Sequence, residues 1–309
     1  KPNIMERIGE IAALATAVCW TVTAIVFESA GKKVGSVAVN IIRLTMAFVL
    51  LAIFTSFNRG LPLPLDASLH TWFWLLLSGL VGFVIGDLFL FEAFTVIGGR
   101  LSMLIMTLAP PFAAIIGFFL LGEKISWLGL LGMSLTVSGI GLVIFTRKNK
   151  GAQTEEAPQH IKQKNSVRLK GILFAMGGAL GQAGGLVLSK FGMEDYDPFA
   201  ATQIRVIAGI IGFVIIITLL RRWPQVNRAI HNKPAMGLVL IGATFGPFIG
   251  VSLSLFAVQH TATGIASTIM AITPIIIIPP SILLFKQKVS LREVIGAVVS
   301  VVGVSLFFI

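Results

Sequence analysis

The sequence has little charge for its length and a single cysteine. Charged residues make up 12% of the 309 positions, about half of what a water-soluble domain carries, and the mean hydropathy is +0.93. This composition excludes a soluble domain and predicts an integral membrane protein. The one cysteine, Cys19, lies inside an apolar run, so an intramolecular disulfide is excluded.

The residue patterns of enzymes are also lacking. The four histidines fall in loops or at the ends of apolar runs, without the H-E-x-x-H spacing or the cysteine partners of a metal site. No Walker-type glycine loop is present, and the serines lack a histidine and a carboxylate at matching depth. We therefore expect no enzyme activity, no cofactor and no direct use of ATP.

Two further features are lacking, a cleavable leader and a basic surface for nucleic acid. The first apolar run is long and lacks a small-residue cleavage pattern, so we expect no signal peptide. The net charge is +11, but the basic residues lie in short loops and no basic, aromatic-interleaved face exists to bind nucleic acid. The partners that we expect are the lipid bilayer and a small-molecule substrate.

What the sequence does contain is one apolar stretch that occurs twice. "LSMLIMTLAPPFAAIIGFFLLGEKIS" runs from Leu101 to Ser126, and "IASTIMAITPIIIIPPSILLFKQKVS" runs from Ile265 to Ser290. A constant offset of 164 aligns Pro110 with Pro274. Each copy holds about 20 apolar residues before its first charge, enough to cross a hydrocarbon core of roughly 30 Å.

Ten such spans are expected along the chain. They are approximately 8–28, 36–57, 71–94, 101–121, 126–146, 169–191, 198–220, 234–257, 261–285 and 290–309. The polar stretch "RKNKGAQTEEAPQHIKQKNSVRLK" separates the fifth from the sixth, so we expect a first five-helix repeat over 1–147, a linker loop over 148–167 and a second repeat over 168–309.

The two halves repeat each other throughout. An offset of 162 places Arg43 on Arg205, each about two turns into the second span of its half. Because five is an odd number, the second copy enters the membrane upside down. The expected fold is therefore an all-α integral membrane protein with ten transmembrane helices arranged as two inverted five-helix repeats.

Lysine and arginine predict the orientation. Of the 24 basic residues, 17 lie on the side of the odd-numbered loops, four on the side of the termini and three within spans. The side with more positive charge is cytoplasmic in most membrane proteins. We therefore expect a multi-pass protein of a prokaryotic cytoplasmic (inner) membrane with both termini non-cytoplasmic.

The paired prolines predict interrupted helices. A proline removes one backbone hydrogen bond and clashes with the preceding turn, so Pro110 and Pro274 should each kink a span. Interruptions at matching places in two halves indicate a transporter's substrate cavity. The alternative is a kink that serves packing alone.

Ionisable residues inside spans are costly and are candidates for function. We expect two charge networks, one at each mouth, that form and break alternately, or else static ion pairs at helix ends. Their members are Glu28, Arg43, Glu92, Lys190 and Arg205. Asp87 has no acidic counterpart, since Val251 stands at the matching position. We expect Asp87 to handle substrate or protons.

Polar residues near mid-depth complete the expected cavity for a small zwitterion or organic cation. With Asp87, the predicted substrate-binding residues are Trp20, Asn40, Thr107, Gln182, Gln203, Thr244, Ser252 and Thr273. Contacts between helices are the alternative role for each polar member. Thr273 is also placed to bond a carbonyl that Pro274 leaves free.

At this point the residues resemble a family, the drug/metabolite transporter superfamily and within it the ten-span EamA-type exporters, which include amino-acid exporters of the YddG type. The matching residues are Trp20 in "AVCWTV", Arg43 in "NIIRLTMA", Arg205 in "TQIRVIAG" and the string "FEAFTVIGGRLSMLIMTLAPPFAAIIGFFLLGEKIS". The second copy departs from it, with "FKQK" where the first has "LGEK". The resemblance implies two EamA-type repeats and transport by alternating access.

The expected function is secondary export of small organic metabolites, with amino acids first. The alternatives are another substrate of the superfamily, such as an organic cation or drug, a nucleobase or a vitamin, and a membrane channel or scaffold. Because one chain already contains both halves of a pathway, a monomer is expected, with a dimer as the alternative.

Overall fold

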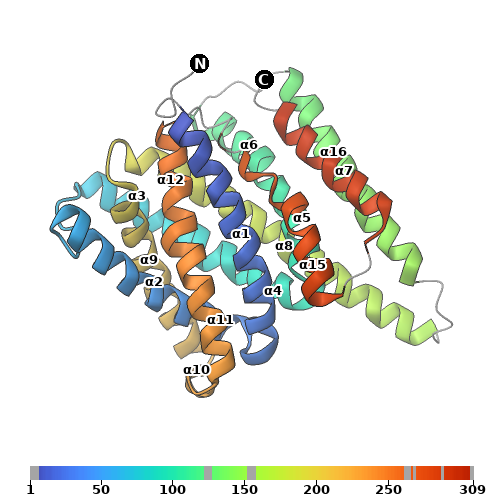
Figure 1. Ribbon diagram of the computed structural model, residues 1–309, viewed down its shortest axis with the longest axis horizontal. Coiled ribbons are helices and arrows are strands. Elements are labelled where there is room, and N and C mark those ends of the chain that lie inside the picture. Colours follow the sequence, from blue (N-terminus) through green and yellow to red (C-terminus); the bar gives the residue numbers. More distant parts are fainter. Residues whose placement is uncertain are drawn as a thin grey trace.

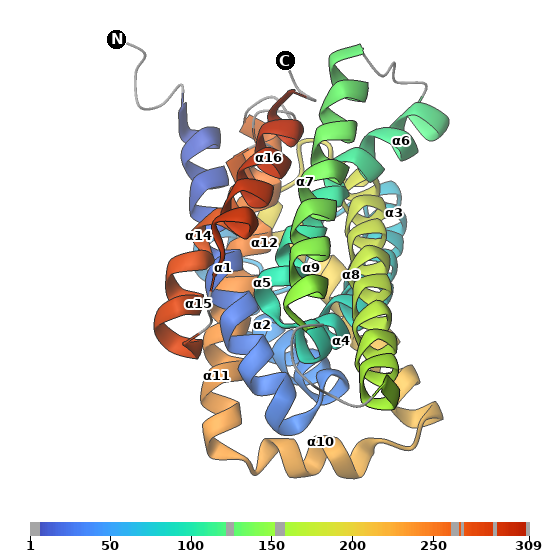
Figure 2. The same ribbon diagram turned by 90° about the vertical axis from the view of Figure 1, so that its right-hand side faces the viewer.

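The computed structural model describes residues 7–121, 127–151, 158–260, 266, 269–286 and 289–306, and every element within them is helical. Figure 1 shows these helices gathered into one bundle, with α7 and α16 side by side at its edge. In Figure 2, α1 begins and α16 ends on the same side of the bundle. We call this side A and the opposite side B.

The first half of the chain crosses the bundle five times. Its helices are α1 (Ile8–Val34), α2 (Ser36–Arg59), α3 (Leu69–Gly79), α4 (Asp87–Ile97), α5 (Gly99–Ile105), α6 (Ala109–Leu121) and α7 (Trp127–Gly151). The second half contains α8 (Pro158–Met193), α9 (Pro198–Leu219), α10 (Trp223–Ile230), α11 (Lys233–Ala243), α12 (Val251–His260), α14 (Thr273–Ile276), α15 (Ile278–Phe285) and α16 (Leu291–Leu306).

The expected membrane fold is confirmed. Seven helical stretches in the described part of the chain are long and apolar enough to cross a membrane, and the shorter apolar helices Trp127–Val143 and Thr273–Leu284 follow the same path. With α16, these stretches account for ten crossings. Several helices do not end where their spans were predicted to end. Helix α1, for example, continues six residues past the predicted end of its span, to Val34.

The polar segment expected as a linker loop over 148–167 is helical at both ends. Helix α7 continues to Gly151 and α8 begins at Pro158, and residues 152–157 lie outside the described part. Proline suits the first turn of a helix, and the Lys and Gln residues that follow are good helix formers. The polar composition therefore marks helix ends that project beyond the membrane as well as a connection.

The fifth spans of the two halves pack on each other with twofold-related contacts. The Thr136 hydroxyl donates to the Ser300 carbonyl and the Ser300 hydroxyl donates to the Thr136 carbonyl, both at 3.3 Å. These two residues are equivalents at the offset of 164. Reciprocal bonds between equivalent residues are what a twofold axis produces, so the pseudo-twofold axis of the repeats passes between α7 and α16.

Each third span contains a π-helical segment at the same register. The segments are Leu80–Gly86, between α3 and α4, and Thr244–Gly250, between α11 and α12, which are again 164 residues apart. In a π-helix each bond closes a wider ring, and such segments occur frequently at functional sites. The interruption thus belongs to the repeated unit and lies in both third spans.

The proline-containing spans are interrupted just before each proline. Helix α5 ends at Ile105, a 3-10 turn follows, and α6 begins at Ala109, one residue before Pro110. In the second half, α14 begins at Thr273, one residue before Pro274. The Thr273 hydroxyl donates to the Met270 carbonyl at 2.8 Å. This carbonyl is the one that Pro274 cannot bond, so Thr273 takes the place of the missing amide, as expected.

Glycines bring α8 unusually close to the π-helical segment Leu80–Gly86. A Cβ built on Gly185 would lie 2.9 Å from the Gly82 Cα, and one built on Gly181 would lie 2.8 Å from the Gly86 nitrogen. Both partners are backbone atoms, which cannot move aside. Small residues at such positions let two helix backbones meet in a membrane.

A short helix lies across the bundle on side B. Figure 2 shows α10 across the end of the bundle, between α9 and α11. Val226 and Ala229 are buried against the core, while Trp223 and Arg228 are exposed. An amphipathic helix with this division of residues suits the membrane–water interface.

Candidate functional site

The centre of the bundle contains a buried ion pair between α2 and α4. Arg43 and Asp87 are 3% and 4% exposed, and Nη2 of Arg43 donates to Oδ2 of Asp87. The other carboxylate oxygen of Asp87 accepts from Nε2 of Gln182 on α8 at 2.6 Å. Both oxygens of Asp87 therefore have partners, and three spans from the two halves meet at this carboxylate.

Arg43 also contacts a polar side chain and two aromatic rings. Its Nε donates to Oδ1 of Asn40 at 2.9 Å, one turn earlier on α2. Its guanidinium lies 4.4 Å from the centroid of the Phe91 ring and 5.6 Å from that of Phe27. Aromatic faces stabilise a cation that has been removed from water. Arg43 is thus a buried charge that a carboxylate, an amide oxygen and two aromatic rings contact.

Arg205, the equivalent of Arg43 in the second half, also packs on the Phe83 ring. It is 4% exposed, and its guanidinium lies 4.8 Å from the centroid of the Phe83 ring. The guanidinium of Arg43 lies 5.8 Å from the same centroid. Arg205 feels the charge of Asp87 without an ion pair to it. Its Nε has no hydrogen-bond partner among the described residues.

This group of Asn40, Arg43, Phe83, Asp87, Gln182 and Arg205 is called the central cluster below. It contains two arginines and one carboxylate, so its formal charge is +1. Charges at this depth are costly unless they are paired. An excess positive charge with an unbonded donor can accept an anionic group.

The structure does not join the other charged residues to the central cluster. Glu28 accepts from Lys32 at 2.5 Å and from the Gly99 amide at 2.6 Å, near side B. Glu92 accepts from the Ser36 hydroxyl at 2.5 Å. These bonds close the ends of α1, α2 and α5, which is the static role that the sequence left open for them.

The network expected on side A is not assembled around Arg205. Lys190 is exposed on α8. In the loop that follows, Asp197 caps α9 through the Ala200 amide at 2.8 Å, and Glu194 lies 3.8 Å from His70. Because the Arg205 side chain packs on Phe83 in the centre of the bundle, it does not reach these acids at the mouth.

Most of the predicted polar lining bonds locally. The hydroxyls of Thr107 and Thr244 donate to their own helices, to the carbonyls of Leu104 at 2.6 Å and Leu240 at 2.9 Å. Trp20 is half-buried and packs on the apolar core. Of the predicted substrate-binding residues, Asn40 and Gln182 join Asp87 in the central cluster through hydrogen bonds to Arg43 and to Asp87 itself.

Two of the predicted substrate-binding residues, Gln203 and Ser252, each have a buried polar atom without a hydrogen-bond partner among the described residues. Gln203 donates to the Pro62 carbonyl at 2.8 Å, which fastens α9 to the loop after α2, while its Oε1 has no partner among the described residues. The Ser252 hydroxyl has none either within that part of the chain. Buried polar atoms without partners are uncommon, so both stay candidates for substrate contact.

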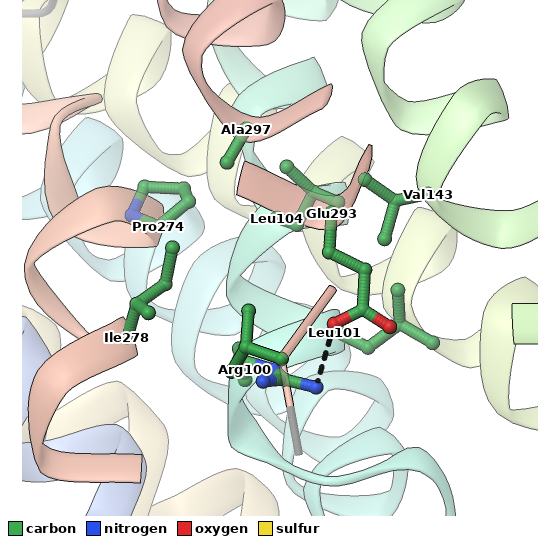
Figure 3. Close-up of a pocket in the computed structure, with 9 residues that line it drawn as sticks. Arg100, Leu101, Leu104, Val143, Pro274, Ile278, Glu293 and Ala297 are labelled. Carbon is green, nitrogen blue, oxygen red and sulfur yellow. Dashed lines mark ion pairs between the residues drawn. The ribbon is translucent and has the colours of Figure 1, made fainter. Parts of the chain in front are cut away.

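Sequence reasoning missed a second buried ion pair, which lines a pocket on the side B half of the bundle. Nη2 of Arg100 on α5 lies 3.1 Å from Oε2 of Glu293 on α16. Figure 3 shows this pair in a pocket that Pro274 and Ile278 also line. The pocket has an empty volume of about 290 Å³, which includes space open to the outside. The orientation count had placed Arg100 in a loop, but helix α5 already includes it.

The offset of 164 places Gly264 opposite Arg100 and Gly129 opposite Glu293. The sequence therefore has charged residues at these two positions in one copy and glycines in the other. This asymmetry is a property of the sequence that inspection of single spans does not reveal.

A polar group on side A was also missed. The Tyr196 hydroxyl donates to Oδ1 of Asp66 at 2.9 Å, and Arg59 forms an ion pair with the same carboxylate. Burial, together with the bond to Asp66, raises the pKa of Tyr196 to about 12. These residues tie the loop after α2 to the loop after α8 and lie away from the central cluster.

Comparison with known proteins agrees with this architecture. The chain is 24% identical over 255 residues to an uncharacterized transporter of Synechocystis sp. (strain ATCC 27184 / PCC 6803 / Kazusa), which covers 80% of this chain and 74% of that protein. A crystal structure of another protein superposes with a TM-score of 0.59 at 15% identity, over 96% of this chain and 95% of that chain. The latter likeness shows the fold alone.

The model of the EamA-like transporter family matches the chain twice, over residues 7–145 and 169–309. The two matches lie on either side of the polar segment and together cover most of the chain. With ten helical crossings, twofold-related contacts between α7 and α16, and charged side chains buried where the halves meet, this chain belongs to the EamA-like transporter family.

Proposed function

We propose that this protein is a secondary transporter that exports small organic metabolites, with amino acids as its first substrate class. The observation that carries the proposal is the central cluster. It buries charges of both signs where spans from the two halves meet, beside the repeated π-helical segments. Ionisable residues inside a membrane bundle mark a substrate or ion pathway by default.

An amino acid suits this cluster because its carboxylate would meet the excess positive charge and its apolar side chain would meet the aromatic rings around the two arginines. In this conformation the cluster is closed, since Arg43, Asp87 and Arg205 are each at most 4% exposed. Access from either side therefore requires the two halves to move, as alternating access does.

Counterflow in liposomes tests the function. Purified protein is reconstituted in vesicles loaded with one unlabelled amino acid, and uptake of the same radiolabelled amino acid is followed against protein-free vesicles. A transporter accumulates label transiently and saturates with concentration, whereas a channel does neither. If none of the twenty amino acids shows counterflow, the amino-acid assignment is wrong, and organic cations, nucleobases and vitamins form the next panel.

We further propose that side B faces the cytoplasm of a prokaryotic inner membrane and that both termini lie outside. The support is the excess of basic residues on side B, including the exposed Arg221, Arg222 and Arg228 next to or within α10. A monomer is the proposed working unit, since one chain holds both halves of the pathway.

Single-cysteine labelling tests the orientation. Cys19 is buried, so a Cys19→Ala background leaves new cysteines as the accessible thiols. Cysteine at Asn227, exposed on α10, should react with a membrane-impermeant maleimide after permeabilisation and not before. Cysteine at Asp195, exposed on side A, should react in intact cells. The reverse pattern would invert the proposed topology.

A further inference from the structure

The central cluster contains one arginine that is paired with a carboxylate and one that is not. Arg43 bonds Asp87 and Asn40 and packs on Phe91. Arg205 packs on Phe83, and its Nε has no hydrogen-bond partner in the described part of the chain. The two residues are equivalent in the repeat, so the difference comes from their surroundings. From it we infer that Arg205 binds the carboxylate of the transported substrate, which rests on the proposed transport function.

The charge of the cluster supports this role. Asp87 bonds Arg43 through one oxygen and Gln182 through the other, so its charge is already paired with Arg43, and Arg205 has no carboxylate of its own in the cluster. The side chain of Arg205 is 4% exposed and keeps its charge under all ordinary conditions. One bound monoanion brings the formal charge of the cluster from +1 to zero.

The shape around Arg205 also suits a carboxylate. A guanidinium presents its N–H groups as a planar fork that matches the two oxygens of a carboxylate. A Cβ built on Gly82 would lie 3.1 Å from Nη2 of Arg205, so the guanidinium packs closely on the glycine, and a larger residue there would crowd the fork. The Phe83 ring covers one face of the guanidinium and offers an apolar surface to the rest of the substrate.

The same contacts argue against recognition through an amine. A substrate ammonium group would add a further positive charge to a cluster whose formal charge is already +1, and the carboxylate of Asp87 is already paired with Arg43. The amino group of an amino acid is therefore secondary. The recognised class is a small organic monocarboxylate, with or without an amino group, and amines, amides and esters of the same skeleton fall outside it.

Competition in the counterflow assay tests this class directly. Uptake of the best labelled amino acid is measured against four competitors that share its skeleton, namely the unlabelled amino acid, its des-amino carboxylic acid, its methyl ester and its decarboxylated amine. We expect the two carboxylates to compete at similar concentrations. The ester and the amine should need at least about a tenfold higher concentration, since a lost charge-assisted bond is a loss of this order.

Substitution of Arg205 provides the second measurement. Arg205→Gln should raise the half-saturating concentration of the amino acid at least about tenfold. Arg205→Lys keeps the charge but not the planar guanidinium, so its half-saturating concentration should lie between those of wild type and Arg205→Gln. Arg205→Gln should also no longer distinguish the carboxylic acid from its methyl ester as competitors. Arg228→Gln is the matched control, because Arg228 is exposed on α10, and it should behave as wild type.

The possible outcomes separate this inference from the proposed function. If the amino acid is transported but its ester competes equally well, or if Arg205→Gln keeps the wild-type acid-to-ester ratio, the inference is overturned and amino-acid export stands. If amino acids are not transported but a des-amino acid is, and Arg205→Gln abolishes this, the inference stands without amino-acid export. If wild type transports neither, both fail. The competitor series uses wild type alone, so it decides even when a variant does not fold.

Discussion

Asp87→Asn is expected to abolish counterflow and to lower the free energy of unfolding by about 3–5 kcal/mol, the cost of breaking a buried ion pair on one side. The substitution removes the one carboxylate of the central cluster and leaves Arg43 and Arg205 buried with like charge. Uptake in liposomes at two pH values measures the loss of transport, and thermal unfolding in detergent measures the loss of stability.

Two further variants make this result specific. Asp195→Asn makes the same chemical change in an exposed loop on side A and should leave both measurements unchanged. The double variant Arg43→Gln with Asp87→Asn removes both partners of the pair, so it should regain much of the stability but not transport. A wild-type rate and pH profile in Asp87→Asn would show that this carboxylate has no part in transport.

Gly181→Leu is expected to destabilise the protein by about 3 kcal/mol or more and to stop transport. The new side chain would meet the backbone of Gly86 and Val81, which cannot move aside without separating α8 from the π-helical segment. Gln182, the next residue, would then lose its bond to Asp87. Thermal unfolding and counterflow again measure the two effects.

Gly237→Leu is the matched control for this packing effect. A Cβ on Gly237 would meet nothing within 4 Å, and the residue lies within α11. Because leucine is the better helix former, this variant should be neutral or more stable by about 1 kcal/mol. Equal loss of stability in both glycine variants would mean that the close approach of α8 is not what Gly181 provides.

The sequence alone was enough to predict the spans and the duplication, for a physical reason. A bilayer demands about 20 apolar residues per crossing, and this demand is local and can be read from one segment at a time. The register of the repeat follows from aligning one half of the sequence with the other, and the equivalence of Thr136 and Ser300 at the α7–α16 contact agrees with it. Only the span boundaries shifted, since helices continue past the apolar core.

The candidate site was predictable in part. Asp87, Arg43, Asn40 and Gln182 were selected because polar and ionisable residues are costly in a span, and the structure brings them together. Glu28 and Glu92 were selected by the same rule but bond near helix ends. Depth along a span follows from the sequence, whereas the direction of a side chain around the helix and the neighbour that it meets do not.

The sequence by itself determined the membrane class, the ten crossings, the inverted repeat and a short set of polar and ionisable residues within spans. These follow from composition, from the length of each apolar segment and from the alignment of the two halves. The tertiary structure decided which charges meet. It joined Arg43 to Asp87, left Arg205 against Phe83 with an unbonded Nε among the described residues, and paired Arg100 with Glu293 on side B. These outcomes depend on helix rotation and on packing between spans distant in the chain, and no single span contains that information.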